Sequence, residues 1–230
     1  MLRPLPPRAV REAATGVKSF VAFWSTNDCS FGNALRLANG RFLSTAHDMP
    51  DRVLQGSGGV GRVNYRGLYY LDGVRMGRFD LQKDLLLLEP TVEHPRYAKG
   101  RALHLPEAHD MLTEGSPVYL VGQRHRKGGL NILEGVYSGM NGTPITSTNE
   151  VDGQTIPRSI PIGSEMVCDF GGHPSVGINP LGEGYSGSAI LDRLGRLVGI
   201  LTTGLYDQAE CVTNKVTAAP ASTIRKFLEG

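Results

Sequence analysis

Two series of short apolar runs, separated by glycine and polar turn residues, fill most of this 230-residue chain. The runs of the first series lie at 17–24, 34–37, 41–44, 60–65, 68–71, 74–79 and 85–88. Those of the second series lie at 117–122, 130–138, 164–170, 188–192 and 195–203. Short strands at this spacing are typical of a β-barrel or a β-sandwich. The sequence therefore predicts an all-β fold in which each series forms one barrel.

The stretches outside the two series complete the expected organisation. The first twelve residues are rich in proline and arginine, which indicates a flexible arm outside the core. Apolar residues at helical spacing after Pro220 predict a short C-terminal helix. The expected units are the N-terminal arm at 1–12, a first barrel at 13–103, a linker at 104–115, a second barrel at 116–219 and the helix at 220–230.

Composition sets broad limits on function. The chain is 40% hydrophobic and 20% charged, as in ordinary globular proteins, and its length supports a substantial core without staples. Cys29, Cys168 and Cys211 are too few and too far apart for a disulfide framework or a metal-binding pair. Prolines interrupt the start where a signal peptide needs a continuous apolar core, and no run has the length of a membrane span. We therefore expect an intracellular, reducing location, no metal or other cofactor, and no membrane segment.

The segment 182–191, Gly-Glu-Gly-Tyr-Ser-Gly-Ser-Ala-Ile-Leu, brackets a serine with glycines just before an apolar run. Glycine permits backbone conformations that expose the hydroxyl and turn neighbouring N–H groups toward whatever it attacks. Ser186 is therefore a candidate nucleophile. Taken alone, the motif is also compatible with a plain glycine-rich turn, so partners elsewhere in the chain must decide.

Two candidate partners precede Ser186 in an informative order. His47 ends one apolar run, and Asp84 opens a run of leucines. The order histidine, aspartate, serine is that of the chymotrypsin-like proteases and differs from the orders of subtilisins and α/β-hydrolases. Thr45-Ala46-His47 resembles that clan's Thr-Ala-His signature, and Asp84 with its leucines resembles Asp-Ile-Ala-Leu. The segment around Ser186 resembles Gly-Asp-Ser-Gly-Gly.

Within that clan, the chain resembles the HtrA-type and viral branches. The segment 131–138 is similar to their Gly-Ile-Val-Ser strand, and 178–190 is similar to their Ile-Asn-Pro-Gly-Asn-Ser-Gly-Gly-Ala-Leu. The likeness spans about residues 30 to 227. It implies two six-stranded antiparallel barrels with the active site between them, and a serine endopeptidase that acts on a peptide or protein through an acyl-enzyme. A viral member would process its own polyprotein in the host cytoplasm.

Triad chemistry gives each candidate a role. His47 is the base that takes the serine proton, because a neutral hydroxyl is a poor nucleophile at pH 7. Asp84 accepts the other imidazole N–H and fixes the tautomer. Asp80 is the competing acid, but the uninterrupted leucines after Asp84 favour Asp84 as the start of a buried strand. Asp48 follows the histidine directly and is interpreted as a loop acid.

The resemblance also implies an oxyanion hole, and it bears on whether the enzyme needs N-terminal cleavage to become active. The hole would be formed by the backbone N–H groups of Gly184 and Ser186. Tyr185 stands where digestive relatives carry an aspartate that pairs with a newly cut N-terminus. Activation through that salt bridge is therefore not expected.

Substrate recognition is expected along one strand edge. The resemblance implies that Thr202, Thr203 and Gly204 form the strand edge with which these proteases pair an extended peptide. Backbone hydrogen bonds at such an edge bind a strand whatever its side chains. Pro180 falls where trypsin-like members place an acidic pocket floor. No fixed charge at that position selects arginine or lysine.

Two other classes of function stay open. The first is a catalytically silent protease-like module that binds peptides, although the presence of all three triad residue types argues against it. The second is nucleic-acid binding, suggested by the basic run 124–127 and by arginines at 3, 8 and 11. A solvated basic loop is the favoured interpretation, because no aromatic residue interleaves with the run and the net charge is only +2. Nucleic acid is therefore not an expected partner.

Overall fold

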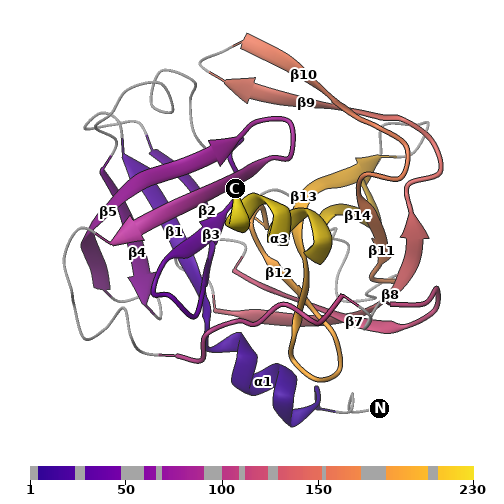
Figure 1. Ribbon diagram of the computed structural model, residues 1–230, viewed down its shortest axis with the longest axis horizontal. Coiled ribbons are helices and arrows are strands. Elements are labelled where there is room, and N and C mark those ends of the chain that lie inside the picture. The colour runs from indigo at the N-terminus through magenta and orange to yellow at the C-terminus, as the bar shows by residue number, and fades with distance from the viewer. Residues whose placement is uncertain are drawn as a thin grey trace.

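The computed structural model describes residues 5–23, 29–47, 60–65, 69–90, 100–108, 112–123, 129–151, 154–171, 185–206 and 212–230. Its strands form two closed six-stranded barrels whose strand pairs are antiparallel, and a short helix follows the second barrel (Figure 1). The fold class expected from the sequence is confirmed.

The first barrel takes in the strands before residue 91. They are β1 (Val17–Phe23), β2 (Cys29–Arg36), β3 (Phe42–Ser44), β4 (Val60–Tyr65), β5 (Tyr69–Asp80) and β6 (Leu85–Pro90), in the order β1-β2-β3-β6-β5-β4. Pairing of β4 with β1 closes the ring. All four leucines of β6 are buried, so this strand is covered on both faces. Burial on both faces explains why it reads as an unbroken apolar run rather than an alternating one.

The second barrel is closed in the same way. Its strands are β7 (Pro117–Gly122), β8 (Asn131–Met140), β11 (Met166–Asp169), β12 (Ala189–Leu191), β13 (Leu197–Tyr206) and β14 (Val212–Pro220), in the order β11-β14-β13-β12-β7-β8. Cys168 packs among the apolar side chains of its interior, with a free thiol. Burial there raises the pKa of the thiol to about 12.

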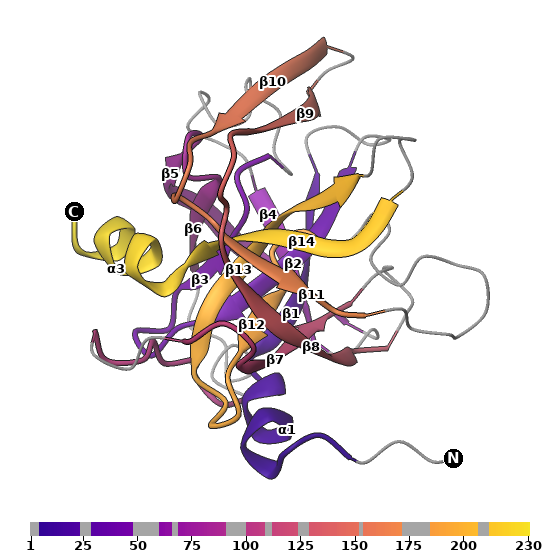
Figure 2. The same ribbon diagram turned by 90° about the vertical axis from the view of Figure 1, so that its right-hand side faces the viewer.

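A separate two-stranded ribbon stands outside both barrels. Strands β9 (Ile145–Val151) and β10 (Gln154–Ile160) pair with each other, between β8 and β11 in the chain. In two perpendicular views the ribbon projects at the top of the molecule, at the end opposite helix α1 (Figure 1, Figure 2). Neither strand is among the runs expected from the sequence, and β14 is also absent from them.

The N-terminal segment differs from the expected arm. Helix α1 spans Arg8–Ala14, and Val10, Ala13 and Ala14 are buried. The expectation that residues 1–12 lie outside the core is therefore wrong for the helical part. The apolar spacing of Val10, Ala13 and Ala14 gives the helix one face to bury.

One apolar cluster joins the two barrels and the two helices of the described residues. It contains Val10 of α1, Leu85 and Leu87 of the first barrel, and Leu191 and Ile200 of the second. Helix α3 (Ala221–Glu229) adds Ile224 and Phe227, as the helical spacing predicted. The barrels are therefore packed on a common core, which fixes the position of one relative to the other.

The segment that crosses between the barrels is bound to both. Leu103 forms a parallel bridge with Leu37, and its N–H donates to the Arg36 carbonyl at 2.8 Å. The N–H of Leu197, in the second barrel, donates to the His104 carbonyl at 2.7 Å. None of the helices within the described ranges is both long and apolar enough to span a membrane.

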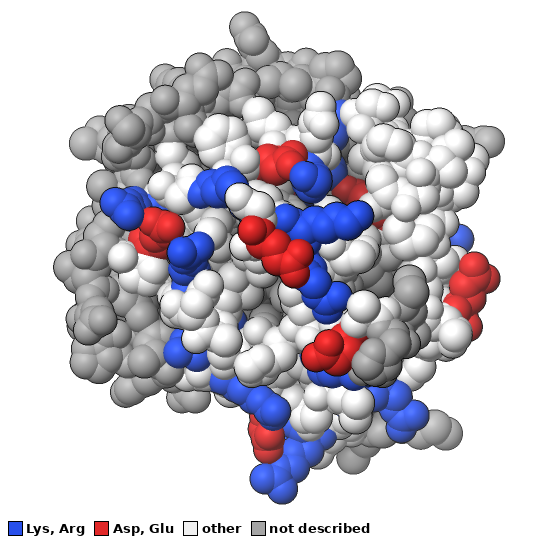
Figure 3. Space-filling view, in the orientation of Figure 1, with Lys and Arg blue, Asp and Glu red and all other residues white. Residues whose placement is uncertain are grey.

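Surface charges are paired locally. Arg8 bonds Glu12 at 2.7 Å, and Arg75 bonds Glu89 at 2.9 Å. Figure 3 shows acidic and basic side chains interspersed over the described part of one face. On this face the described charges do not form the single-sign field that steers a protein toward nucleic acid. The basic run 124–127 and Arg3 are outside the described residues.

Candidate active site

Two of the candidate residues lie at the same end of neighbouring strands. β3 and β6 are antiparallel, with Ser44 opposite Leu86. His47 follows the end of β3, and Asp84 immediately precedes β6, so the register brings their backbones together. Asp84 adopts a left-handed backbone conformation, with φ at 55°. Aspartate tolerates this region better than most residues.

The third candidate comes from the other barrel. Ser186 lies in the turn before β12, and Gly187 after it has φ at 74°. A Cβ atom on Gly187 would lie 2.3 Å from the Asn33 carbonyl oxygen. Glycine is therefore required at this position for two reasons: the left-handed backbone conformation and the close approach to β2.

Asn33 fixes the serine turn against the first barrel. Its backbone N–H and its Nδ2 both donate to the Ser186 carbonyl, at 2.9 and 3.1 Å. Its Oδ1 accepts from the N–H of Gln123 at 2.7 Å. A single buried amide thus connects β2 with the turn that carries Ser186 and with the end of β7.

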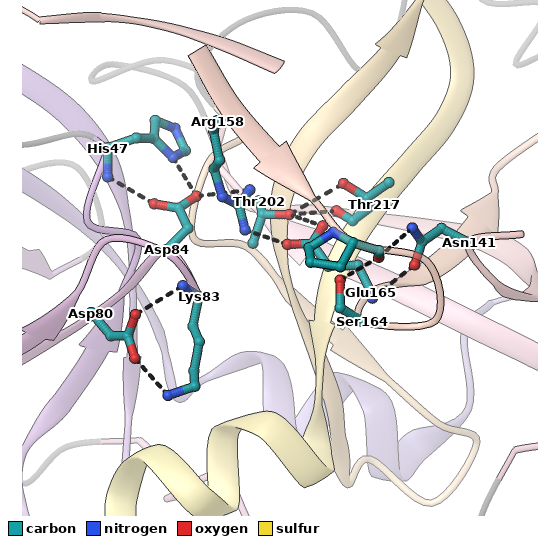
Figure 4. Close-up of polar contacts among 11 residues, drawn as sticks. His47, Asp80, Lys83, Asp84, Asn141, Arg158, Ser164, Glu165, Thr202 and Thr217 are labelled. Carbon is teal, nitrogen blue, oxygen red and sulfur yellow. Dashed lines mark hydrogen bonds and ion pairs between the residues drawn. The ribbon is translucent and has the colours of Figure 1, made fainter. Parts of the chain in front are cut away.

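The structure brings the three candidates into one hydrogen-bonded chain. His47 Nδ1 lies 2.6 Å from Asp84 Oδ2, and the His47 backbone N–H donates to Asp84 Oδ1 at 2.8 Å (Figure 4). His47 Nε2 lies 2.8 Å from Ser186 Oγ. Asp84 is 1% exposed, whereas His47 and Ser186 are partly accessible. With Asp84 ionised, the imidazole proton is on Nδ1, which leaves Nε2 free to accept the serine proton.

The competing acid is turned elsewhere. Asp80 accepts from the backbone N–H of Lys83 at 3.0 Å and from its Nζ at 2.6 Å (Figure 4). Partial burial raises the pKa of Asp80, but the hydrogen bonds from Lys83 outweigh it and the pKa is lowered overall. Of Asp84 and Asp80, Asp84 is the one in contact with His47. Asp48, the third acid weighed from the sequence, is outside the described residues.

The residues around the serine are held by local contacts. The Tyr185 side chain is buried in the second barrel, and its hydroxyl accepts from Asn131 Nδ2 at 2.9 Å. The N–H of Ser188 donates to the Tyr185 carbonyl at 3.0 Å. Of the two residues expected to form an oxyanion hole, Ser186 lies in this turn, while Gly184 is outside the described residues. Pro180 is also outside them.

The expected substrate edge lies on β13. The ladder between β12 and β13 runs no further than Ile200, whereas Thr203 and Gly204 pair with β14 on the other side. Thr202 lies where the pairing of β13 with β14 shifts register. Its buried hydroxyl donates to Glu165 Oε2 at 2.8 Å. Since its side chain faces inward, any contact of Thr202 with a peptide would have to come from its backbone.

A buried ion pair beside Asp84 was not expected from the sequence. Arg158 of β10 hydrogen-bonds Glu165, and its Nη1 lies 3.8 Å from Asp84 Oδ2 (Figure 4). One sequence signal was available: Arg158 occupies the same period-two face as Ile156 and Ile160, which marks it as inward-facing. Within the described ranges, no three His, Cys, Asp or Glu side chains are grouped so that they could hold a metal ion.

Two six-stranded barrels that contribute a histidine and an aspartate from one and a serine from the other form the architecture of the chymotrypsin-like serine proteases. Solved structures agree at the level of the fold. The Rv3671c protease of M. tuberculosis, in its active form, superposes with a TM-score of 0.70 at 14% identity, over 100% of this chain and 93% of that one. An HtrA-type protease with a tripeptide gives a TM-score of 0.62 at 18% identity, over 96% of this chain and 61% of that one. No family model and no curated protein matches the sequence.

Proposed function

We propose that this protein is a serine endopeptidase that cleaves peptide bonds through His47, Asp84 and Ser186. The observation that carries the proposal is the unbroken chain of short contacts from Ser186 Oγ to His47 Nε2 and from His47 Nδ1 to the buried Asp84. In a two-barrel fold, this is the arrangement that activates a serine for attack on a carbonyl.

The reaction proceeds in two halves. Ser186 Oγ attacks the peptide carbonyl carbon while His47 Nε2 takes the hydroxyl proton, and Asp84 stabilises the resulting imidazolium. The tetrahedral intermediate then collapses: the C–N bond breaks, His47 returns the proton to the leaving amine, and an acyl-serine ester remains. Water, deprotonated by the same Nε2, hydrolyses the ester in the second half.

The negative oxygen of each tetrahedral intermediate requires donors. In the proposed hole these are the N–H groups of Ser186 and Gly184. Tyr185 has no charge with which to bind a new N-terminus, and its hydrogen bond with Asn131 and its burial hold the turn instead. The peptidase therefore needs no N-terminal cleavage to become active.

The substrate is an extended peptide with an uncharged residue before the scissile bond. The backbone of Thr202, Thr203 and Gly204, beyond the end of the β12 ladder, supplies the pairing edge. The HtrA-type structure that this fold resembles contains a tripeptide, which supports a peptide ligand. Pro180 in place of an acidic pocket floor leaves a basic side chain without a partner, so such peptides bind poorly.

The first test is labelling with a fluorophosphonate, which reacts only with an activated serine. Wild-type protein should be labelled, whereas Ser186→Ala should not be, and its turnover should fall by about a million-fold. Equal labelling of the variant would contradict the assignment. Unlabelled wild-type protein that still binds peptides would favour the catalytically silent module.

The second test is a diverse peptide library, cut by the purified, uncleaved protein. Cleavage after small or apolar residues is expected. Strict cleavage after arginine or lysine would refute the specificity, and activity that appears only after N-terminal trimming would refute the mode of activation.

A further inference from the structure

The two-stranded ribbon β9–β10 places a buried cation, the guanidinium of Arg158, beside the candidate triad. Arg158 lies near the end of β10, and it is 7% exposed although most arginines are solvated. Its guanidinium lies between two carboxylates that are also buried, those of Asp84 and Glu165. The ribbon emerges from the second barrel, whereas Asp84 belongs to the first, so this contact crosses between the barrels.

The guanidinium is only partly satisfied. One of its terminal nitrogens hydrogen-bonds Glu165 Oε1. Among the described residues, Nε and Nη1 have no hydrogen-bond partner, and Nη1 is 3.8 Å from Asp84 Oδ2. If Arg158 only stabilised the fold, most of its buried N–H groups should donate hydrogen bonds, because an unpaired buried donor is costly. The unused donor instead faces the carboxylate that binds His47.

The oxygen that Arg158 approaches is the one that His47 uses. Asp84 Oδ2 accepts the imidazole N–H at 2.6 Å, while Oδ1 accepts the backbone N–H of His47. A cation on the same side limits the rotation of the carboxylate and stabilises its charge. The same cation opposes the gain of a proton by His47, and Glu165 behind it offsets part of this effect.

Glu165 is fixed from its other side. Its Oε2 accepts from the Thr202 hydroxyl at 2.8 Å, and Thr202 also contacts the Thr217 hydroxyl at 3.3 Å. The N–H of Glu165 donates to Asn141 Oδ1 at 3.0 Å. Glu165 therefore anchors the guanidinium to the interior of the second barrel, beside the proposed peptide edge.

The structure assigns Arg158 as a positioning residue of the triad, held by Glu165, that orients Asp84 toward His47 and sets the basicity of the imidazole. This role rests on the proposed peptidase activity, but its electrostatic part concerns only His47 and can be measured without turnover. Among the residues that the structure describes, the charged groups placed against Asp84 are His47 and Arg158, with Glu165 behind the arginine, while Lys83 is turned to Asp80.

The decisive measurement is the titration of His47 by NMR, in full-length protein with labelled histidine rings and assigned with His47→Gln. Arg158→Met removes the cation at similar length, so the midpoint of His47 should rise by about one pH unit. Arg158→Met with Glu165→Gln removes both charges, so the midpoint should return toward the wild-type value. A change in packing alone would not be reversed by a second substitution in the same place.

The second measurement is the rate at which a fluorophosphonate labels Ser186 across the same pH range. In both Arg158 variants the rate should fall by about ten- to a hundredfold, because a misplaced acid misorients the base. Arg196→Met is the matched control: it breaks a partly buried pair with Asp192, whose Arg196 Nε–Asp192 Oδ2 distance is 2.6 Å, and should change neither readout.

The outcomes separate the two proposals. An Arg158→Met protein that folds and behaves like Arg196→Met in both readouts refutes the role of Arg158, while a labelled wild-type protein preserves the peptidase. If Arg158→Met does not fold, a double variant that labels at the wild-type rate refutes it instead. Wild-type protein that is never labelled, but whose His47 midpoint depends on Arg158, supports the electrostatic link and refutes the peptidase.

Discussion

Asp84 combines two demands that few side chains meet. In the proposed triad it must be an acid within reach of His47. Its backbone is also left-handed, a conformation that most residues adopt only at a cost of about 1 kcal/mol or more. Asparagine has the same shape and the same tolerance of this conformation. Asp84→Asn therefore changes the charge and hydrogen bonding of the site while keeping its backbone.

We expect Asp84→Asn to fold and to lose activity by about ten-thousand-fold, because the amide favours the wrong imidazole tautomer; this magnitude is the known one for the triad aspartate of trypsin. The measurement is kcat/KM on the best library peptide. Asp80→Asn is the matched control: it weakens hydrogen bonds to Lys83 and to the Gln82 backbone, away from His47, so its kcat/KM should stay within about twofold. Greater damage from Asp80→Asn would exchange the roles of the two acids.

Among the elements, the turn that carries Ser186 depends on its contact with β2. Gly187→Ala should push the turn away from Asn33, since the new Cβ would overlap the Asn33 carbonyl. We expect fluorophosphonate labelling to fall by at least about tenfold, with a loss of about 1–3 kcal/mol in the free energy of unfolding.

Gly40→Ala is the control that separates the effect of backbone strain from the effect of a clash with a neighbouring atom. Gly40 also has a positive φ, of 81°, but a Cβ atom there meets nothing within 4 Å. Its labelling rate should remain at the wild-type value even if stability declines. Equal losses in the two variants would mean that backbone conformation, and not the approach to β2, limits the site.

Most barrel strands could be predicted from the sequence, whereas the ribbon, β14 and helix α1 could not. The leucines of β6 and the motifs around His47 and Ser186 predicted a barrel strand and the three candidate residues that the structure brings into contact. The ribbon was missed because Pro157 and several hydroxyl residues weaken its strand pattern, although Asp152-Gly153 is a favoured two-residue hairpin sequence. The long-range contacts of Arg158 and Asn33 depend on tertiary packing, which no local pattern encodes.

At the scale of the whole molecule, the common core makes the two barrels depend on each other and on helix α1. Val10 of this helix is fully buried in that core. We expect Val10→Ala to lower the free energy of unfolding by about 2 kcal/mol and to keep one cooperative transition, measured by urea denaturation and hydrogen exchange.

Leu5→Ala provides the matched control, because Leu5 is 78% exposed. Its stability should be unchanged within about 0.5 kcal/mol. If Val10→Ala had equally little effect on stability, residues 8–12 would behave in solution as the arm that their composition suggested.

The buried thiol of Cys168 gives the second barrel a sensitivity to alkali. In the unfolded chain this thiol has a pKa of 9.0, whereas the folded barrel holds it protonated up to about 12. Below pH 9 both states carry the proton, and the thiol does not affect the balance between them. As the pH rises above 9, the unfolded state releases the proton before the folded state does, so the folded state loses stability progressively. A core residue that is inert at neutral pH thus makes alkaline solution a gradual denaturant of this barrel.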